Sequence, residues 1–209
     1  MVPALYIKDK VVTGLHHGDA FAKLNDHEKN DDELLSGFLD DEHHKFITDD
    51  GAIYLKDIIL LRHAQSDLRV EDGPITPSGR GQAFRVATFL KELHLAGYVG
   101  YCSPYLRCKQ TSAIIREVCS IPFETDMHLS KQSSCENTTN FTTRIVETLD
   151  NLPQKSVLIT HTDCIQNILI LTHLIKENLK CVVNCSITYI HQNRLIWLAK
   201  DINAEENRS

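Results

Sequence analysis

The sequence contains no long run of basic residues, no apolar segment of membrane-spanning length and no paired CxxC spacing. Without clustered Lys and Arg, nucleic acid is a poor expectation for the main ligand. The most apolar window, CIQNILILTHLI, is too short and too polar to span a bilayer, which takes ~20 residues. Without CxxC pairs, the cysteines do not predict a zinc site. We therefore expect a globular chain whose partners are neither nucleic acid nor a membrane.

Cysteine usage also bears on the compartment. The chain has seven cysteines, an odd number, so at least one thiol has no partner within the chain. Most of them lie in apolar segments, where cysteine behaves as a small hydrophobic residue. The start, MVPALYIKDKVV, lacks a basic region followed by an apolar one, so no signal peptide is expected. Both features favour a reducing, cytoplasmic location.

Composition predicts one main domain with a small appended unit. The 209 residues are 42% hydrophobic and 24% charged, which is typical of a folded chain. The net charge is -6, and the acidic residues gather in NDHEKNDDELLSGFLDDEHH, which favours a solvated surface. We expect an N-terminal extension of unknown role over residues 1–55, a main domain over 56–200 and a polar tail over 201–209. Within the extension, a strand or hairpin is expected at 4–14, a helix start near 19 and a hairpin at 45–55.

The main domain alternates strand and helix patterns. Strands are expected at 57–61, 97–103, 122–129 and 156–161, helices at 76–93, 105–119, 138–152 and 163–175, and a closing hairpin at 185–200. The run DIILL is apolar throughout, as in a strand buried on both faces. Ser78 or Thr76 is a plausible cap of the first helix. This alternation predicts an α/β fold with three α/β/α layers around a mostly parallel sheet, plus the small α+β extension.

Charged and polar residues follow three of the predicted strands. The first strand ends at Arg62 and His63, and the last parallel strand ends at His161. Arg107 begins the helix that follows the second strand. Because the carboxyl ends of parallel strands meet at one edge of a sheet, we expect these four side chains to converge there.

Two arginines and two histidines at one spot describe a pocket for a dianion. Guanidinium groups stay charged, fork onto phosphate oxygens and stabilise the charge that spreads over them during phosphoryl transfer. Nearby positive charge disfavours the cationic form of a histidine, and a neutral imidazole nitrogen can accept a phosphoryl group. The pattern therefore favours phosphoryl chemistry.

Four segments in this order resemble the motifs of the histidine phosphatase, or phosphoglycerate mutase-like, superfamily. They are LLRHAQSD, with alanine in place of the usual glycine, ITPSGRGQA, YCSPYLRCKQTSAII and VLITHTDCIQNIL. The resemblance covers about Asp57 to Trp197, and its layout is closest to the small phosphohistidine phosphatase-type members.

The resemblance implies a role for each matching residue. His63 is expected to become phosphohistidine, Arg62 and Arg107 to clamp the phosphoryl group, and His161 to donate a hydrogen bond to it. The resemblance also implies that neither a metal nor another cofactor takes part. Residues expected to contact the substrate are Gln65, Ser66 and Thr162.

The proton donor for the leaving group is the part of the family pattern that this sequence does not match. Where mutase-type members carry a glutamate, the segment HLSKQSSCENTT places Lys131. Glu136, a few residues later, and Asp163, two residues after the second histidine, are the main candidates. Asp126 and Asp67 are weaker ones, and the solvent or the substrate can also supply the proton.

The resemblance thus predicts a metal-independent phosphatase of the histidine acid phosphatase type. Its substrate is expected to be a phosphomonoester or phosphoamidate, carried by a phosphorylated small molecule or a phosphoprotein. Two alternatives stay open: phosphoglycerate mutase-like phosphoryl transfer, and a catalytically weak module that binds a phosphorylated ligand. The short insert after the third strand offers little material for the closed lid that a mutase needs.

Overall fold

The computed structural model describes residues 5–7, 10–12, 57–175, 182–191 and 194–199. Its main sheet has six strands in the order β5-β4-β6-β3-β7-β8. Their bounds are β3 Asp57–Arg62, β4 Val99–Cys102, β5 Phe123–Thr125, β6 Lys155–Thr160, β7 Ile187–His191 and β8 Arg194–Ala199. The first four strands in chain order pair in parallel, whereas β7 and β8 run antiparallel. The predicted mostly parallel sheet and its closing hairpin are confirmed.

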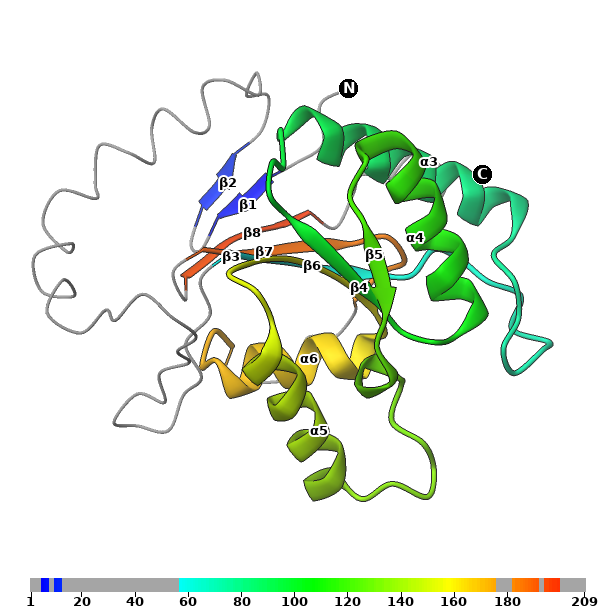
Figure 1. Cartoon of the computed structure of the whole chain (residues 1–209), viewed down its shortest axis with the longest axis vertical. Helices are drawn as coiled ribbons and strands as arrows, with labels where there is room; N and C mark the ends of the chain where they lie inside the picture. The colour runs from blue at the N-terminus through cyan, green and yellow to red at the C-terminus, as the bar shows by residue number, and fades with distance from the viewer. Residues whose placement is uncertain (1–4, 8–9, 13–56, 176–181, 192–193, 200–209) are drawn as a thin grey trace, which may run out of the picture.

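Helices cover both faces of this sheet (Figure 1). The α-helices in the described residues are α3 Pro77–Glu92, α4 Leu106–Cys119, α5 Thr138–Asn151 and α6 Thr162–Leu171. Helices α3 and α4 pack together on one face, and α5 and α6 lie on the other. The three-layer α/β/α fold expected from the alternation is therefore confirmed.

Strand β3 shows why its run of aliphatic residues is continuous. Ile59 and Leu61 belong to the cluster that packs under α3 and α4, whereas Ile58 and Leu60 belong to the cluster under α5 and α6. All four side chains are buried. Burying an aliphatic side chain of this size contributes about 1.5–3 kcal/mol, so both layers hold the strand in the centre of the sheet. The strand that ends in Arg62 is thus firmly fixed.

The start of α3 holds the loop that leaves β3. Thr76 is the N-cap, and its hydroxyl accepts a hydrogen bond from the Gly79 amide at 3.0 Å. Of the two predicted caps, Thr76 is the one used. A Cβ atom at Gly79 would lie 2.1 Å from the carbonyl oxygen of Gln65, so only glycine permits this approach of helix and loop. The loop after His63 is therefore packed directly against α3.

One predicted strand is shorter than expected. The segment 122–129 was predicted as one strand, but β5 ends at Thr125 and a 3₁₀ turn occupies Met127–Leu129. The carboxylate of Asp126 causes this break, because it accepts a hydrogen bond from the amide of His128 at 2.8 Å and so caps the turn.

The predicted hairpin at 4–14 is present as β1 Leu5–Ile7 and β2 Lys10–Val12, which pair antiparallel. Strand β1 lies against β8 of the main sheet. The expected helix start near residue 19, the hairpin at 45–55 and the domain boundaries at 55 and 200 lie outside the described residues.

Candidate active site

A cavity of about 480 Å³ opens at the carboxyl ends of β3 and β6. All four residues that the sequence places at this edge, Arg62, His63, Arg107 and His161, line it. The other lining residues are Ser66, Asp67, Leu68, Val70, Glu71, Lys131, Thr162, Asp163 and Gln166. The volume is that of a small-molecule site.

Parallel pairing brings the two histidines together. Arg62, the last residue of β3, is paired in register with Thr160, the last residue of β6. The residues that follow, His63 and His161, therefore leave neighbouring strands at the same level, and their ring centroids lie 5.2 Å apart.

The hydrogen bonds of His63 define its protonation pattern. Its Nδ1 lies 2.8 Å from the carbonyl oxygen of Ala64, and a carbonyl oxygen only accepts, so Nδ1 carries the proton. Nε2 consequently holds the free lone pair, and Arg107 Nε donates to it at 3.2 Å. A nucleophilic nitrogen is thus placed beside a guanidinium group inside the cavity.

Arg107 is held from several sides. Its Nη1 donates to the carbonyl oxygen of Glu71 at 3.2 Å and lies 3.7 Å from a carboxylate oxygen of Asp72. Its guanidinium carbon lies 4.5 Å from the centroid of the Tyr105 ring, within the range of a cation–π contact. The side chain is buried. These contacts fix the guanidinium group before any substrate arrives.

His161 is also buried and lies between polar partners. Its Nδ1 lies 3.5 Å from Nη2 of Arg107, which can only donate, so Nδ1 accepts. Nε2 therefore carries the proton and donates to the hydroxyl of Ser103 at 2.8 Å. In this arrangement the histidine proton is directed at Ser103, and the expected donation from His161 to a phosphoryl group requires a different tautomer or ring orientation.

Burial lowers the pKa of both histidines. The pKa of His63 falls to about 4, first through desolvation and to a smaller extent through the charges of Arg107 and Arg62. The pKa of His161 falls to about 2, again mainly through burial. Both rings are therefore neutral near pH 7, as a nucleophile requires. The sequence indicated only the charge contribution, because burial of these side chains depends on the tertiary packing.

These shifts predict acid sensitivity of the fold. Between pH 6.5 and pH 4, the unfolded chain binds a proton at His63 that the folded chain does not, so the free energy of unfolding decreases as the pH falls. From pH 7 to pH 5 we expect His63 alone to account for a loss of about 2 kcal/mol. Urea unfolding at both pH values should show a smaller loss for His63→Gln than for the unaltered chain. Equal losses would contradict the shift.

The residues expected to contact the substrate separate into two groups. Ser66 and Thr162 line the cavity. Gln65 does not, since its side-chain oxygen accepts a hydrogen bond from the hydroxyl of Thr76 at 3.0 Å, at the start of α3. Its position fits a residue that holds the loop rather than one that touches the substrate.

The candidate proton donors lie in different places. Asp163 lines the cavity, with one oxygen accepting from the amide of Gln132 at 2.5 Å and the other from the amide of Cys164 at 2.9 Å. Glu136 is not among the lining residues, and its carboxylate is bound by both Nε and Nη2 of Arg144, at 2.6 and 2.8 Å. This geometry favours Asp163.

The two weaker candidates are both committed elsewhere. Asp67 lines the cavity, but its carboxylate forms an ion pair with Arg69 at 2.7 Å. Asp126 caps the 3₁₀ turn.

Residues 58–133 match the sequence model described as histidine phosphatase superfamily (branch 1). The match contains the segment LLRHAQSD, including His63, which lines the cavity. The resemblance to the histidine phosphatase superfamily is confirmed.

Several solved structures share this fold. SixA from Agrobacterium tumefaciens has a TM-score of 0.56 at 16% identity, over 69% of this chain and 97% of its own. The protein histidine phosphatase SixA in complex with tungstate has a TM-score of 0.55 at 17% identity, over 71% and 99%. A mycobacterial glucosyl-3-phosphoglycerate phosphatase has a TM-score of 0.51 at 18% identity, over 68% and 95%. No curated protein sequence matches this chain. These likenesses show the fold, with a layout like that of SixA.

Three features of this site were not assigned from the sequence. Lys131 lines the cavity, Tyr105 packs edge-on against His161 with ring centroids 5.0 Å apart, and Asp72 lies beside Arg107. Lys131 stood out only as the residue in place of a glutamate. No sequence signal marks Tyr105, in the loop before α4, or Asp72, in the loop between β3 and α3, because only the folded chain brings these two loops to Arg107.

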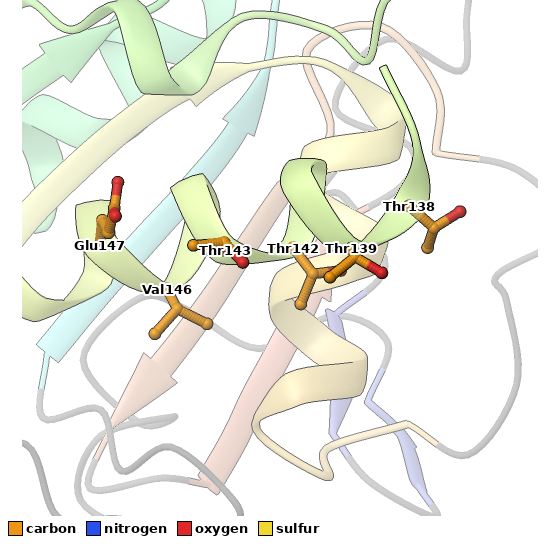
Figure 2. Close-up of a pocket in the computed structure, with 6 residues that line it drawn as sticks. All are labelled: Thr138, Thr139, Thr142, Thr143, Val146 and Glu147. Atoms are coloured by element: carbon orange, nitrogen blue, oxygen red, sulfur yellow. The ribbon is translucent and has the colours of Figure 1, made fainter.

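A second hollow, of about 410 Å³, lies along α5 (Figure 2). Its walls are side chains of that one helix: Thr138, Thr139, Thr142, Thr143, Val146 and Glu147. The hydroxyl of Thr142 already accepts a hydrogen bond from Asn167 of α6 at 3.1 Å. The hollow offers no nucleophile with a neighbouring base, so we assign it no chemistry.

Residues 5–7, 10–12, 57–175, 182–191 and 194–199 contain neither a candidate metal site nor a candidate membrane span. In those ranges, no group of three or more His, Cys, Asp or Glu side chains is arranged to hold a metal ion. No helix there has the length and apolar character needed to cross a membrane.

Proposed function

We propose that this protein is a phosphatase that hydrolyses a phosphomonoester or phosphoamidate through a phosphohistidine intermediate on His63. The observation that carries the proposal is the convergence of Arg62, His63, Arg107 and His161 in one cavity, with the lone pair of His63 on Nε2. A neutral buried imidazole is a nucleophile, and two guanidinium groups match a dianionic phosphoryl group.

The proposed reaction has two steps. In the first, the lone pair of His63 Nε2 attacks phosphorus, the bond from phosphorus to the leaving oxygen or nitrogen breaks, and that atom takes a proton from Asp163. Arg107 and Arg62 stabilise the charge on the phosphoryl oxygens. In the second step a water molecule attacks phosphorus and gives a proton to the Asp163 carboxylate, the bond to Nε2 breaks, and inorganic phosphate leaves with His63 neutral again. The hydrogen bond from Nδ1 of His63 to the carbonyl oxygen of Ala64 holds the ring in place throughout both steps.

The structural relatives support this choice of substrate class. One is described as a protein histidine phosphatase complexed with tungstate, and another as a phosphatase of glucosyl-3-phosphoglycerate. Tungstate is a tetrahedral oxyanion, and the cationic cavity of this chain suits such a group.

The division into an extension at 1–55, a catalytic domain at 56–200 and a tail at 201–209 remains part of the proposal.

Incubation with 4-nitrophenyl phosphate tests the proposal directly. We expect release of inorganic phosphate that is competitively inhibited by tungstate and unaffected by EDTA. An isomerised product from a sugar phosphate, without free phosphate, would instead identify a mutase. Binding of tungstate without any turnover would identify the third alternative, a binding module.

Substitution of the two candidate acids should identify the proton donor. Asp163→Asn is expected to lower kcat/KM by about 10²-fold for an alkyl phosphate, whose leaving group needs a proton, but only weakly for 4-nitrophenyl phosphate. Glu136→Gln serves as the matched control, because Glu136 is bound to Arg144 outside the cavity. Equal losses of Asp163→Asn on both substrates would show that Asp163 only holds the Gln132 amide.

A further inference from the structure

Lys131 is a cationic residue of the cavity that has no role in the proposed reaction. The two arginines already match the two charges of a phosphoryl group. Lys131 lines the same cavity, on the segment between the 3₁₀ turn and α5. Its ammonium nitrogen lies 5.6 Å from the centroid of the Tyr105 ring.

The backbone around Lys131 is held in place by the fold. The carbonyl oxygen of Lys131 accepts a hydrogen bond from Nη2 of Arg144 at 3.2 Å. The amide of the next residue, Gln132, donates to the carboxylate of Asp163. Arg144 is itself fixed by the carboxylate of Glu136. The lysine is thus presented to the cavity by a braced segment that ties α5 to the start of α6, unlike a lysine on a free surface.

Three acidic residues at or beside the cavity have other partners. Asp67 pairs with Arg69, and Asp72 lies beside Arg107. Asp163 accepts two backbone amides. Within the part of the chain that the structure describes, no carboxylate lies within 4.0 Å of the Lys131 ammonium group. A cation at the wall of an anion site, without a carboxylate partner there, attracts a further anion.

Tyr105 sets the spacing between this lysine and the phosphoryl clamp. The guanidinium carbon of Arg107 and the ammonium nitrogen of Lys131 lie 4.5 and 5.6 Å from the centroid of the same ring. The two cations are therefore near enough to bind neighbouring anionic groups of one small molecule.

We infer that Lys131 forms a second anion subsite, so that the preferred ligand carries a phosphate or carboxylate group close to the phosphoryl group held by Arg107. The inference rests on the proposed function for the position of that phosphoryl group. Lys131 is then a specificity-determining residue, and a substrate with a single isolated phosphoryl group uses only part of the cavity.

Phosphonates test this inference without turnover, because their C–P bonds are not cleaved by the proposed reaction. Isothermal titration gives Kd for methylphosphonate, which has one anionic group, and for phosphonoacetate and methylenediphosphonate, which add a carboxylate or a second phosphonate. We expect at least one of the last two to bind about tenfold more tightly than methylphosphonate, the effect of one added charged contact. Comparing phosphonoacetate with methylenediphosphonate shows whether a carboxylate or a second phosphonate group is preferred.

Three variants separate the subsite from general charge effects. Lys131→Met should abolish the preference, and Lys131→Arg should retain it. Lys109→Met, which removes an exposed lysine of α4 outside the cavity lining, should leave the preference unchanged. A preference that survives Lys131→Met, or no binding of any phosphonate by the unaltered chain, would overturn the inference.

The same measurements separate this inference from the proposed function. Hydrolysis of 4-nitrophenyl phosphate without a Lys131-dependent preference would retain the phosphatase and remove the subsite. A Lys131-dependent preference without any hydrolysis would retain the subsite and remove the phosphatase.

Discussion

Replacing His63 with alanine is expected to lower kcat/KM for 4-nitrophenyl phosphate by at least about 10³-fold, because the covalent route disappears with the nucleophile. The fold should survive. The His63 ring is buried at the wall of a cavity, and the loop does not depend on it for its position. The Ala64 amide donates to the Thr111 hydroxyl at 3.1 Å, and the His63 carbonyl oxygen accepts from the Asn184 side chain at 2.9 Å. Circular dichroism should therefore match that of the unaltered chain.

The intermediate itself provides a second measurement. Rapid quenching in alkali should trap a phosphoryl group on the unaltered chain, and its lability in acid is the signature of phosphohistidine. His63→Ala should trap none. His128→Ala is the matched control, since this histidine is half-exposed and does not line the cavity. Undiminished turnover by His63→Ala would eliminate the covalent mechanism.

The position of the site was predictable from the sequence because strand ends determine it. The apolar run before Arg62 fixes a strand buried on both faces, and parallel pairing with the strand before His161 requires the two ends to meet. Arg107 follows from the same rule, because β4 lies on the other side of β6. None of these inferences depends on side-chain packing.

The acids and Lys131 were not predictable in this way, because loops place them. From the sequence, Glu136 and Asp163 are equally good candidates for the proton donor. Only the folded structure shows that Glu136 is bound to Arg144 and that Asp163 lines the cavity. The folded segment after β5 directs Lys131 inward. Sequence reasoning also missed that burial, rather than the arginines, dominates the pKa of His63, since burial is a property of the whole packed site.

Replacing Arg107 with alanine is expected to lower kcat/KM by about 10²-fold or more, through lost stabilisation of the phosphoryl charge in the transition state. Arg107→Lys should recover only part of the loss, because an ammonium group keeps the charge but cannot donate through a planar fork. Arg116→Ala is the matched control, as it removes an exposed arginine from the same helix away from the cavity. Unchanged kcat/KM for Arg107→Ala would show that the guanidinium group serves only the fold.

A pH titration distinguishes a role in the site from a role in folding. The charge of Arg107 helps to lower the pKa of His63, so Arg107→Ala should raise that pKa from about 4 towards its ordinary value. The midpoint of the His63 ring signals in an NMR titration should therefore move to higher pH, and it should move less in Arg107→Lys, which keeps a positive charge nearby. Because desolvation is the larger cause of the shift, the pKa should stay below 6.5 in both variants. If Arg107→Ala lowers kcat/KM but leaves the midpoint of the His63 titration unchanged, Arg107 acts on the substrate and not on the nucleophile. That result would contradict the 3.2 Å contact between Nε of Arg107 and Nε2 of His63.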